Sequence, residues 1–163
     1  MNRQDRLRLI GFDGTFDPNI IGQCINQYYQ STPLQPRDYY GSTEFKLEGY
    51  PFHCTGKDAI RTRRLLIKVL ETLQTHGWSV LTGIDVSRKD HDKSIITFIK
   101  SEPKSVPFAC IALSDVSTLR IIDFPAYEQE RLAEIVRSTY GYGIYNEKSI
   151  DEKCLQFKLQ VKL

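Results

Sequence analysis

The chain changes its pattern most sharply in the stretch Leu73-Gln74-Thr75-His76-Gly77-Trp78-Ser79-Val80. Before Gly77, apolar residues recur at helical spacing and predict an amphipathic helix from Lys57 to His76, with the glycine as its stop. After Gly77, apolar residues alternate with other residues, which is typical of a β-strand. The change of period at one glycine therefore predicts a helix followed directly by a strand over residues 78–86.

Three more strand-like segments follow this first strand. Residues 95–99 and 119–122 are short and apolar, and residues 108–113 are apolar on both faces, as in a central strand. The connections between the segments are too short for crossover helices, so neighbouring strands are expected to run antiparallel. Together the four segments predict a four-strand antiparallel meander.

Helices and outer strands flank this meander. The further predicted elements are a strand over 7–12, a helix from Asp17, a Pro-containing connector over 32–41, a strand over 44–48, a second amphipathic helix after Pro125 and an alternating strand over 155–163. The sequence thus predicts a single α+β domain over residues 1–163. Its sheet is expected to be mostly antiparallel, with the four-strand meander flanked by two to three helices.

The composition of the chain indicates which partners and which cellular compartment to expect. The 163 residues carry 22 basic and 20 acidic side chains, and the net charge of +2 is too balanced to predict binding to nucleic acid or anionic membranes. No apolar run of signal-peptide or transmembrane length occurs, so no membrane partner is expected. The four cysteines contain no Cys-x-x-Cys pair, which favours reduced thiols in a cytoplasmic or nuclear protein over an extracellular disulfide.

No cluster of residues predicts a metal or a cofactor. Asp90-His91-Asp92 offers hard ligands, but no second cluster has matching spacing, so a solvated hairpin tip is expected there. The chain also has no P-loop and no dinucleotide fingerprint. We therefore expect neither a metal nor a cofactor.

Gly14-Thr15-Phe16-Asp17-Pro18, between a predicted strand and a predicted helix, resembles the entry to phosphopantetheine adenylyltransferase and its relatives. The resemblance implies a parallel sheet and a loop that continues to [T/H]-x-G-H, whose polar side chains bind nucleotide phosphates. On this sequence the glycine falls on Gly22, while Ile20 and Gln23 take the two polar positions. Neither side chain supplies the phosphate contacts, which favours a simple helix start at Asp17-Pro18.

A second motif, His53-Cys54-Thr55-Gly56-Lys57-Asp58, resembles the H-C-x5-R loop of cysteine phosphatases. The resemblance implies a Cys54 thiolate nucleophile and an arginine that holds the phosphate oxygens. The arginine position holds Ile60, and Arg61 comes one residue late. The alternative is a capping box at the start of the long helix, with Thr55 as N-cap and Asp58 reaching back. A non-catalytic anion site beside Lys57 and Arg61 stays open as well.

Two surfaces are candidates for binding a partner. One is a basic stripe on the long helix, and the other is the tyrosine-rich region over residues 37–50. The candidate contact residues are Lys57, Arg61, Arg64, Lys68, Tyr39 and Tyr40. Tyrosine and arginine are enriched at protein interfaces and also form stacking platforms for single-stranded nucleic acid.

The sequence therefore predicts a non-catalytic, intracellular module that binds another protein. The first alternative is a phosphate- or nucleotide-ligand enzyme or pseudoenzyme that uses the loop at residues 14–18 or 53–58. The second is an RNA-binding module, which the balanced charge makes the less favoured partner class. Charge reversal of Arg61 and Arg64 is expected to abolish partner binding and to leave the melting temperature nearly unchanged.

Overall fold

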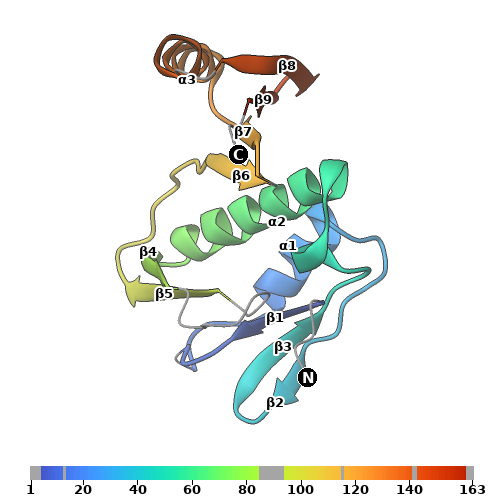
Figure 1. The fold of residues 1–163 in the computed structure, drawn as a ribbon. Coiled ribbons are helices and arrows are strands. Elements are labelled where there is room, and N and C mark those ends of the chain that lie inside the picture. The colour runs from blue at the N-terminus through green and yellow to red at the C-terminus, as the bar shows by residue number, and fades with distance from the viewer. Residues whose placement is uncertain (1–4, 13, 85–93, 115, 141–142, 161–163) are drawn as a thin grey trace. The chain divides into compact units, whose positions relative to one another are not determined.

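The computed structural model describes residues 5–12, 14–84, 94–114, 116–140 and 143–160 (Figure 1). The described strands form three antiparallel sheets, and helices occur beside them, so the predicted α+β class is confirmed. Contacts between Cα atoms divide the chain into two compact units, Met1–Pro107 and Phe108–Leu163. No described helix is long and apolar enough to cross a lipid bilayer.

The first unit is built on a three-stranded sheet. Strands β1 (Arg6–Leu9), β3 (Ser42–Lys46) and β2 (Arg37–Tyr39) lie in the order β1-β3-β2 and pair antiparallel. Helices α1 (Asn19–Tyr28) and α2 (Gly56–Thr75) pack with it around one core, which includes Leu9, Ile21, Ile25, Phe45, Leu47, Leu65, Val69 and Leu73. Alternation on β3 points Phe45 into this core and Glu44 to the opposite face.

The long helix α2 enters this core with Leu65, Val69 and Leu73. The helical spacing predicts an apolar stripe of Ile60, Ile67, Leu70 and Leu73, with Leu66 beside them. Ile60, Ile67 and Leu73 are indeed buried, and of these Leu73 belongs to the cluster that packs on the sheet. The helix carries two apolar rows, and periodicity alone does not say which row meets the sheet. The predicted helix end is confirmed, because Gly77 has φ +80° and a Cβ there would lie 2.7 Å from the Ser101 carbonyl oxygen.

Strands β4 (Trp78–Ile84) and β5 (Ile95–Lys100) complete the first unit as a two-stranded antiparallel sheet. Trp78 and Phe98 pack against the core, and the register shifts between Val80 and Thr82. The single-turn helix η1 (Pro51–His53) lies between β3 and α2 along the chain.

The second unit is a four-stranded sheet with one helix. Strands β6 (Cys110–Ser114), β7 (Thr118–Ile122), β9 (Cys154–Leu159) and β8 (Ile144–Asp151) follow in the order β6-β7-β9-β8, all antiparallel. Helix α3 (Ala126–Thr139) packs on one face, around Ile121, Ala133, Leu155 and Phe157.

The antiparallel pairing is confirmed, but the membership of the four-stranded sheet differs from the prediction. The predicted meander of consecutive strands divides into the pairs β4–β5 and β6–β7, one in each unit. The chain between them contains Pro103 and Pro107, which interrupt local pairing. The C-terminal hairpin β8–β9 completes the sheet, and neither β8 nor β2 was expected as a strand.

Candidate functional site

A two-residue turn joins β2 to β3. Tyr39 pairs with Ser42 across the hairpin, and the residues between them, Tyr40 and Gly41, have φ of +51° and +77°. Positive φ at both central positions is the signature of a type I′ turn, whose twist matches that of the flanking strands. The Ser42 hydroxyl donates a hydrogen bond to the Tyr39 carbonyl at 2.6 Å, which fixes the turn from inside.

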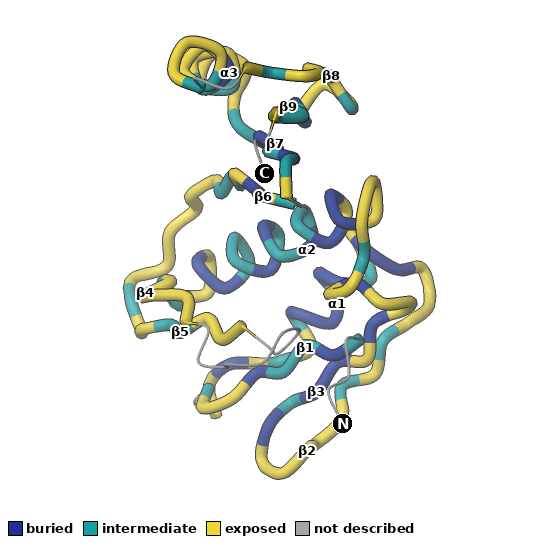
Figure 2. Tube along the Cα trace, viewed as in Figure 1, coloured by how far each residue is buried: buried dark blue, intermediate teal, exposed yellow. Residues whose placement is uncertain are grey.

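Tyrosine is an unfavourable residue for the left-handed position that Tyr40 occupies. Glycine, asparagine and aspartate are preferred there, and a left-handed conformation costs other residues about 1–2 kcal/mol. Tyr40 is 93% exposed, so burial of its ring does not offset this cost. Figure 2 shows the exposed β2 beside the more buried β3. The fold thus displays a strained aromatic residue to solvent, which is a common property of functional sites.

The two tyrosines and one arginine form an ordered aromatic group. The rings of Tyr39 and Tyr40 meet edge to face, with centroids 4.9 Å apart and an interplanar angle of 90°. The Arg8 guanidinium carbon lies 4.1 Å from the Tyr39 ring centroid. Edge-to-face and cation–π contacts each contribute about 0.5–1.5 kcal/mol, so the group is held in place without a partner. We call Arg8, Tyr39 and Tyr40 the hairpin cluster.

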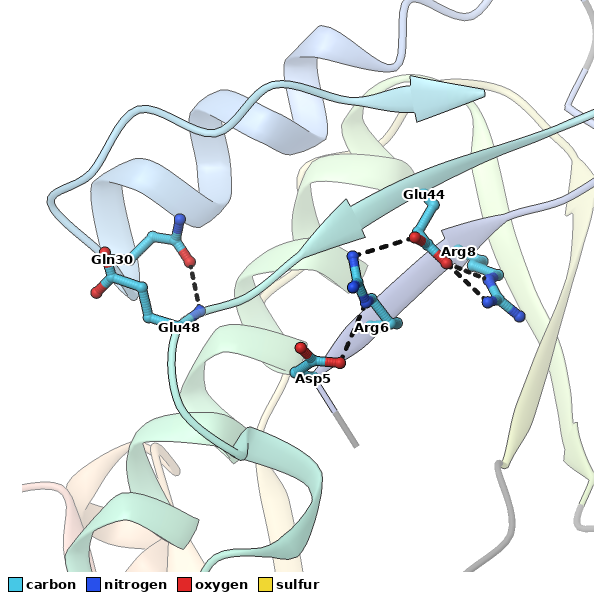
Figure 3. Close-up of polar contacts among 6 residues, drawn as sticks. All are labelled: Asp5, Arg6, Arg8, Gln30, Glu44 and Glu48. Carbon is cyan, nitrogen blue, oxygen red and sulfur yellow. Dashed lines mark hydrogen bonds and ion pairs between the residues drawn. The ribbon is translucent and has the colours of Figure 1, made fainter. Parts of the chain in front are cut away.

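The guanidinium of Arg8, which lies over the Tyr39 ring, is also paired with Glu44, and Figure 3 shows this pairing. Arg8 Nε donates to Glu44 Oε2 at 2.8 Å, and Arg6 Nη1 donates to Glu44 Oε1 at 3.1 Å. Arg6 Nε also lies 3.1 Å from Asp5 Oδ1, without hydrogen-bond alignment. The Glu44 side chain is only 6% exposed, and two guanidinium groups compensate its buried charge. Both Glu44 oxygens are therefore occupied, and they position Arg8 within the hairpin cluster.

The predicted basic stripe lies along α2 on the side of α1. Lys57 is exposed, whereas Arg64 is half-buried and engaged in further contacts. Lys68 Nζ donates to Glu71 Oε2 at 2.7 Å and lies 5.7 Å from the Tyr28 ring centroid. Lys57 and Arg61 are therefore the exposed cations of the stripe, while Arg64 and Lys68 are half-buried.

Arg61 is the member of the stripe that is most tightly engaged. Its Nη2 donates to the Tyr29 carbonyl oxygen, and its guanidinium carbon lies 4.7 Å from the Tyr29 ring centroid. The Tyr29 hydroxyl in turn donates to the Glu48 carbonyl at 3.3 Å. Burial raises the pKa of the Tyr29 phenol, against the opposing effects of a hydrogen bond with Thr62 and of the Arg61 charge. This pairing of tyrosine with arginine joins α1 to α2.

A cavity of about 390 Å³ lies beside the Cys54 loop. Its lining includes Tyr29, Tyr50, His53, Cys54 and Arg61, so the late arginine does reach the same cavity as the cysteine. Gln30 Oε1 accepts the Glu48 N–H at 3.0 Å and fixes the chain at the cavity edge (Figure 3). Glu48 and Asp58 also belong to the lining. Two carboxylates against one guanidinium weigh against an anion at this position, although anion binding there stays a prediction.

The segment around Cys54 differs from the open loop that the phosphatase resemblance implies. Helix α2 begins at Gly56, only two residues after the cysteine, so the loop backbone that would surround a phosphate is helical. The Cys54 thiol donates to the Pro51 carbonyl at 2.9 Å. The predicted capping box is wrong: Thr55 is the N-cap residue, but no side chain makes a capping hydrogen bond. Gly56 has φ +60°, so the chain enters the helix through a left-handed residue.

The segment over residues 14–18 leads into α1, which begins at Asn19 with Pro18 as its N-cap residue, whereas the sequence predicts a start at Asp17. Asp17 Oδ1 accepts the N–H of Asn19 at 2.9 Å, and Pro18 already has helical angles of −65° and −17°. Phe16 is buried and meets Trp78 edge to face, with ring centroids 6.5 Å apart. The parallel sheet that the transferase resemblance implied is absent among the described strands, all of which pair antiparallel.

Sequence reasoning missed Arg8 and Glu44 as members of the candidate site. Their signal was present, because Arg8 alternates with apolar residues and Glu44 with Phe45, which places both on one face of the sheet. The Asp90-His91-Asp92 segment lies outside the described residues. Within the described part of the chain, no three His, Cys, Asp or Glu side chains gather as metal ligands.

Comparison with curated proteins and with solved structures finds no significant match. A family model, described as a domain, matches residues 1–99 and 107–162. The match includes the hairpin cluster, the Cys54 loop and the sheet of the second unit. The chain therefore belongs to the domain family whose model extends over residues 1–99 and 107–162.

Proposed function

We propose that this chain is a non-catalytic module that binds another protein through the hairpin cluster. The observation that carries the proposal is Tyr40, which is 93% exposed and held at φ +51°. A residue that weakens its own turn and gains nothing from burial is best explained by a contact outside the chain. Tyrosine and arginine are the residues that most often dominate binding energy at protein interfaces.

The electrostatics of the cluster favour a protein over a nucleic acid. Arg8 is paired with Glu44, and the net charge of the chain is only +2. A phosphate backbone is bound by cations that are free to neutralise it, and this affinity falls steeply with salt. We expect binding through the two exposed rings to depend only weakly on salt.

The basic stripe is the second candidate surface in this proposal. Arg61 contacts Tyr29, and Lys68 contacts Glu71 and Tyr28, all within the first unit. Lys57 and Arg61 are exposed, but Arg61 is already engaged in its contact with Tyr29. A partner on the stripe would compete with these internal contacts. A partner on the hairpin cluster would not have to displace internal contacts in this way, because the rings of Tyr39 and Tyr40 are already exposed to solvent.

The proposal also places the protein in a reducing compartment, the cytoplasm. Cys24, Cys54, Cys110 and Cys154 all lie among the described residues and form no disulfide there, and Cys24 and Cys154 are buried. Buried free cysteines behave as small hydrophobic residues and persist where thiols stay reduced.

Affinity capture from an extract of the cells that make the protein tests the proposal. Three immobilised baits are compared: the wild-type chain, Tyr40→Asn and the matched control Tyr145→Asn. Tyr145 is 79% exposed on β8 and therefore undergoes the same chemical change elsewhere. We expect a protein that the wild-type and Tyr145→Asn baits retain and the Tyr40→Asn bait loses. Identical capture by all three baits would contradict the proposal.

A further inference from the structure

The two edges of the sheet in the second unit differ in how they are protected against further pairing. In the order β6-β7-β9-β8, β6 and β8 each pair with one described strand, so these two strands form the edges. An edge exposes backbone N–H and C=O groups, and proteins commonly protect it with charged residues, prolines or β-bulges. A comparison of β6 with β8 therefore shows which edge can accept another strand.

Strand β8 has two of these protective features. Its register with β9 shifts twice along its length, which is the mark of a bulged or irregular edge. It also carries charged side chains, among them Glu147 and Lys148. Both features are typical of an edge that does not accept another strand.

Strand β6 has none of them. Its residues, Cys110 to Ser114, include no charged residue and no proline, and its register with β7 is regular. Ile111 and Leu113 are 54% and 76% exposed, and Figure 2 shows β6 beside the more buried β7. The edge is thus regular, uncharged and apolar, which is the form that pairs most readily with a further strand.

The exposed residues of β6 continue the core of the second unit. Ile111 pairs with Ile121 and Leu113 with Leu119, and residues directly opposite each other in antiparallel strands point to the same face. That face carries α3, which buries Ile121 to 1% exposure and packs on Leu155 and Phe157 of β9. Helix α3 therefore covers this apolar face at β7 and β9 and leaves it exposed at β6.

We propose that two copies of this chain associate by antiparallel pairing of their β6 strands around Ala112. In this register Ile111 of one copy lies opposite Leu113 of the other, on the face that carries α3 in both copies. On the opposite face Cys110 lies opposite Ser114, and Ala112 lies opposite its own equivalent. A second copy is the occupant that this edge fits, because the strand is complementary to itself and brings no like charges together.

The limited size of the contact predicts a weak dimer. A strand of five residues is about 17 Å long. Stable interfaces bury about 800 Å² on each partner, and one strand edge with two exposed apolar side chains supplies only part of that area. We therefore expect a dissociation constant between about 1 μM and about 1 mM.

The test is sedimentation equilibrium of the full-length chain in reducing buffer, over concentrations from about 1 μM to about 1 mM. The reducing buffer prevents a disulfide between copies from imitating the strand pairing. We expect the average mass to rise with concentration from one copy towards two, because a two-fold interface closes on itself. A chain that stays monomeric, or that grows beyond two copies, would overturn the inference.

Leu113→Lys places a charge opposite Ile111 of the other copy and should weaken the dimer at least tenfold. Because Leu113 is 76% exposed, the variant should fold as wild type does. Tyr145→Lys is the matched control, since Tyr145 is 79% exposed on β8, the opposite edge of the same sheet, and it should leave the dimer unchanged. Equal association of Leu113→Lys and wild type would contradict the pairing through β6.

Hydrogen exchange of the wild-type chain locates the interface without any substitution. Amides of β6 should exchange more slowly at high than at low protein concentration, while those of β8 should be unaffected. Slower exchange at β8 in place of β6 would overturn the inference. The inference is independent of the proposed function, so Tyr40→Asn, which alters the first unit, should associate as wild type does.

Discussion

Two pairings of tyrosine with arginine among the described residues of the first unit have opposite roles. At the end of α1, Tyr29 is 9% exposed, and its hydroxyl donates a hydrogen bond to the Glu48 carbonyl. Arg61 donates a hydrogen bond to the carbonyl oxygen of Tyr29. At the β2–β3 turn, Tyr40 is 93% exposed, and Arg8 stacks on the neighbouring Tyr39. The first pairing joins two helices, whereas the second faces solvent.

The difference shows that tyrosine content alone does not mark a binding surface. Both regions place aromatic residues beside cations, and in sequence they look equivalent. The two regions differ in where their side chains make contacts. Every contact of Tyr29 and Arg61 described above is with a residue of the same unit. The Tyr40 ring contacts the Tyr39 ring and is otherwise exposed to solvent. Loss of Tyr29 should therefore cost stability, and loss of Tyr40 should cost binding.

The largest effect on stability is expected for Tyr29→Ala. Removal of a buried aromatic ring leaves a cavity and typically costs about 3–5 kcal/mol in the free energy of unfolding. The same substitution at the exposed Tyr40 should stay within about 0.5 kcal/mol of wild type. Urea unfolding of both variants measures the two values, and equal losses would remove the distinction between the two regions.

A charge reversal at Arg61 and Arg64 comes next. Sequence alone predicts an unchanged melting temperature, but Arg61 is bonded to Tyr29 and Arg64 is half-buried. We expect Arg61→Glu with Arg64→Glu to lower the free energy of unfolding by about 1–3 kcal/mol, since a charge-assisted hydrogen bond is lost. Lys57→Glu, in the exposed part of the stripe, is the control and should have little effect. If the double variant is as stable as wild type, the contacts of Arg61 and Arg64 do not stabilise the fold.

The stability of the protein at alkaline pH should depend on the buried Tyr29 phenol. Burial raises the pKa of Tyr29 above its usual value of 10.0, so the folded state keeps the phenol proton longer than the unfolded state does. This contribution is complete below pH 10 and is lost as pH rises through the folded pKa, by at most about 1.4 kcal/mol per pH unit. Burial also raises the pKa of Cys24, which acts in the same direction.

Urea unfolding at rising alkaline pH therefore compares wild type with Tyr29→Phe, which keeps Cys24. The variant loses the hydroxyl bond to Glu48 and should start lower, but its stability should fall less steeply above pH 10. Parallel curves for the two proteins would show that Tyr29 titrates as an exposed phenol.

The sequence predicted local structure better than it predicted long-range partners. Gly77 ended the helix where the period changed, and Asp17-Pro18 leads into α1, because both signals act within a few residues. The grouping of strands into sheets was not predictable, since local rules pair neighbours and β7 pairs with the distant β9 as well. The left-handed Tyr40 was also hidden, because its conformation is imposed by the register Tyr39–Ser42 and not by its own preference. Alternation places Arg8 on one face of its strand, but its contact with Tyr39 depends on the order of the strands in the sheet, which local spacing does not give.

Tyr40→Asn tests the role of the exposed ring directly, because its stability and its affinity for the partner can both be measured. Asparagine suits a left-handed turn position followed by glycine, so the free energy of unfolding should stay constant or rise by about 0.5–1 kcal/mol. The affinity for the captured partner should fall at least tenfold, about 1.4 kcal/mol. Stability that holds while binding is lost would establish that Tyr40 is kept for its partner. Unchanged affinity, or a loss of binding that accompanies a loss of stability, would contradict the account.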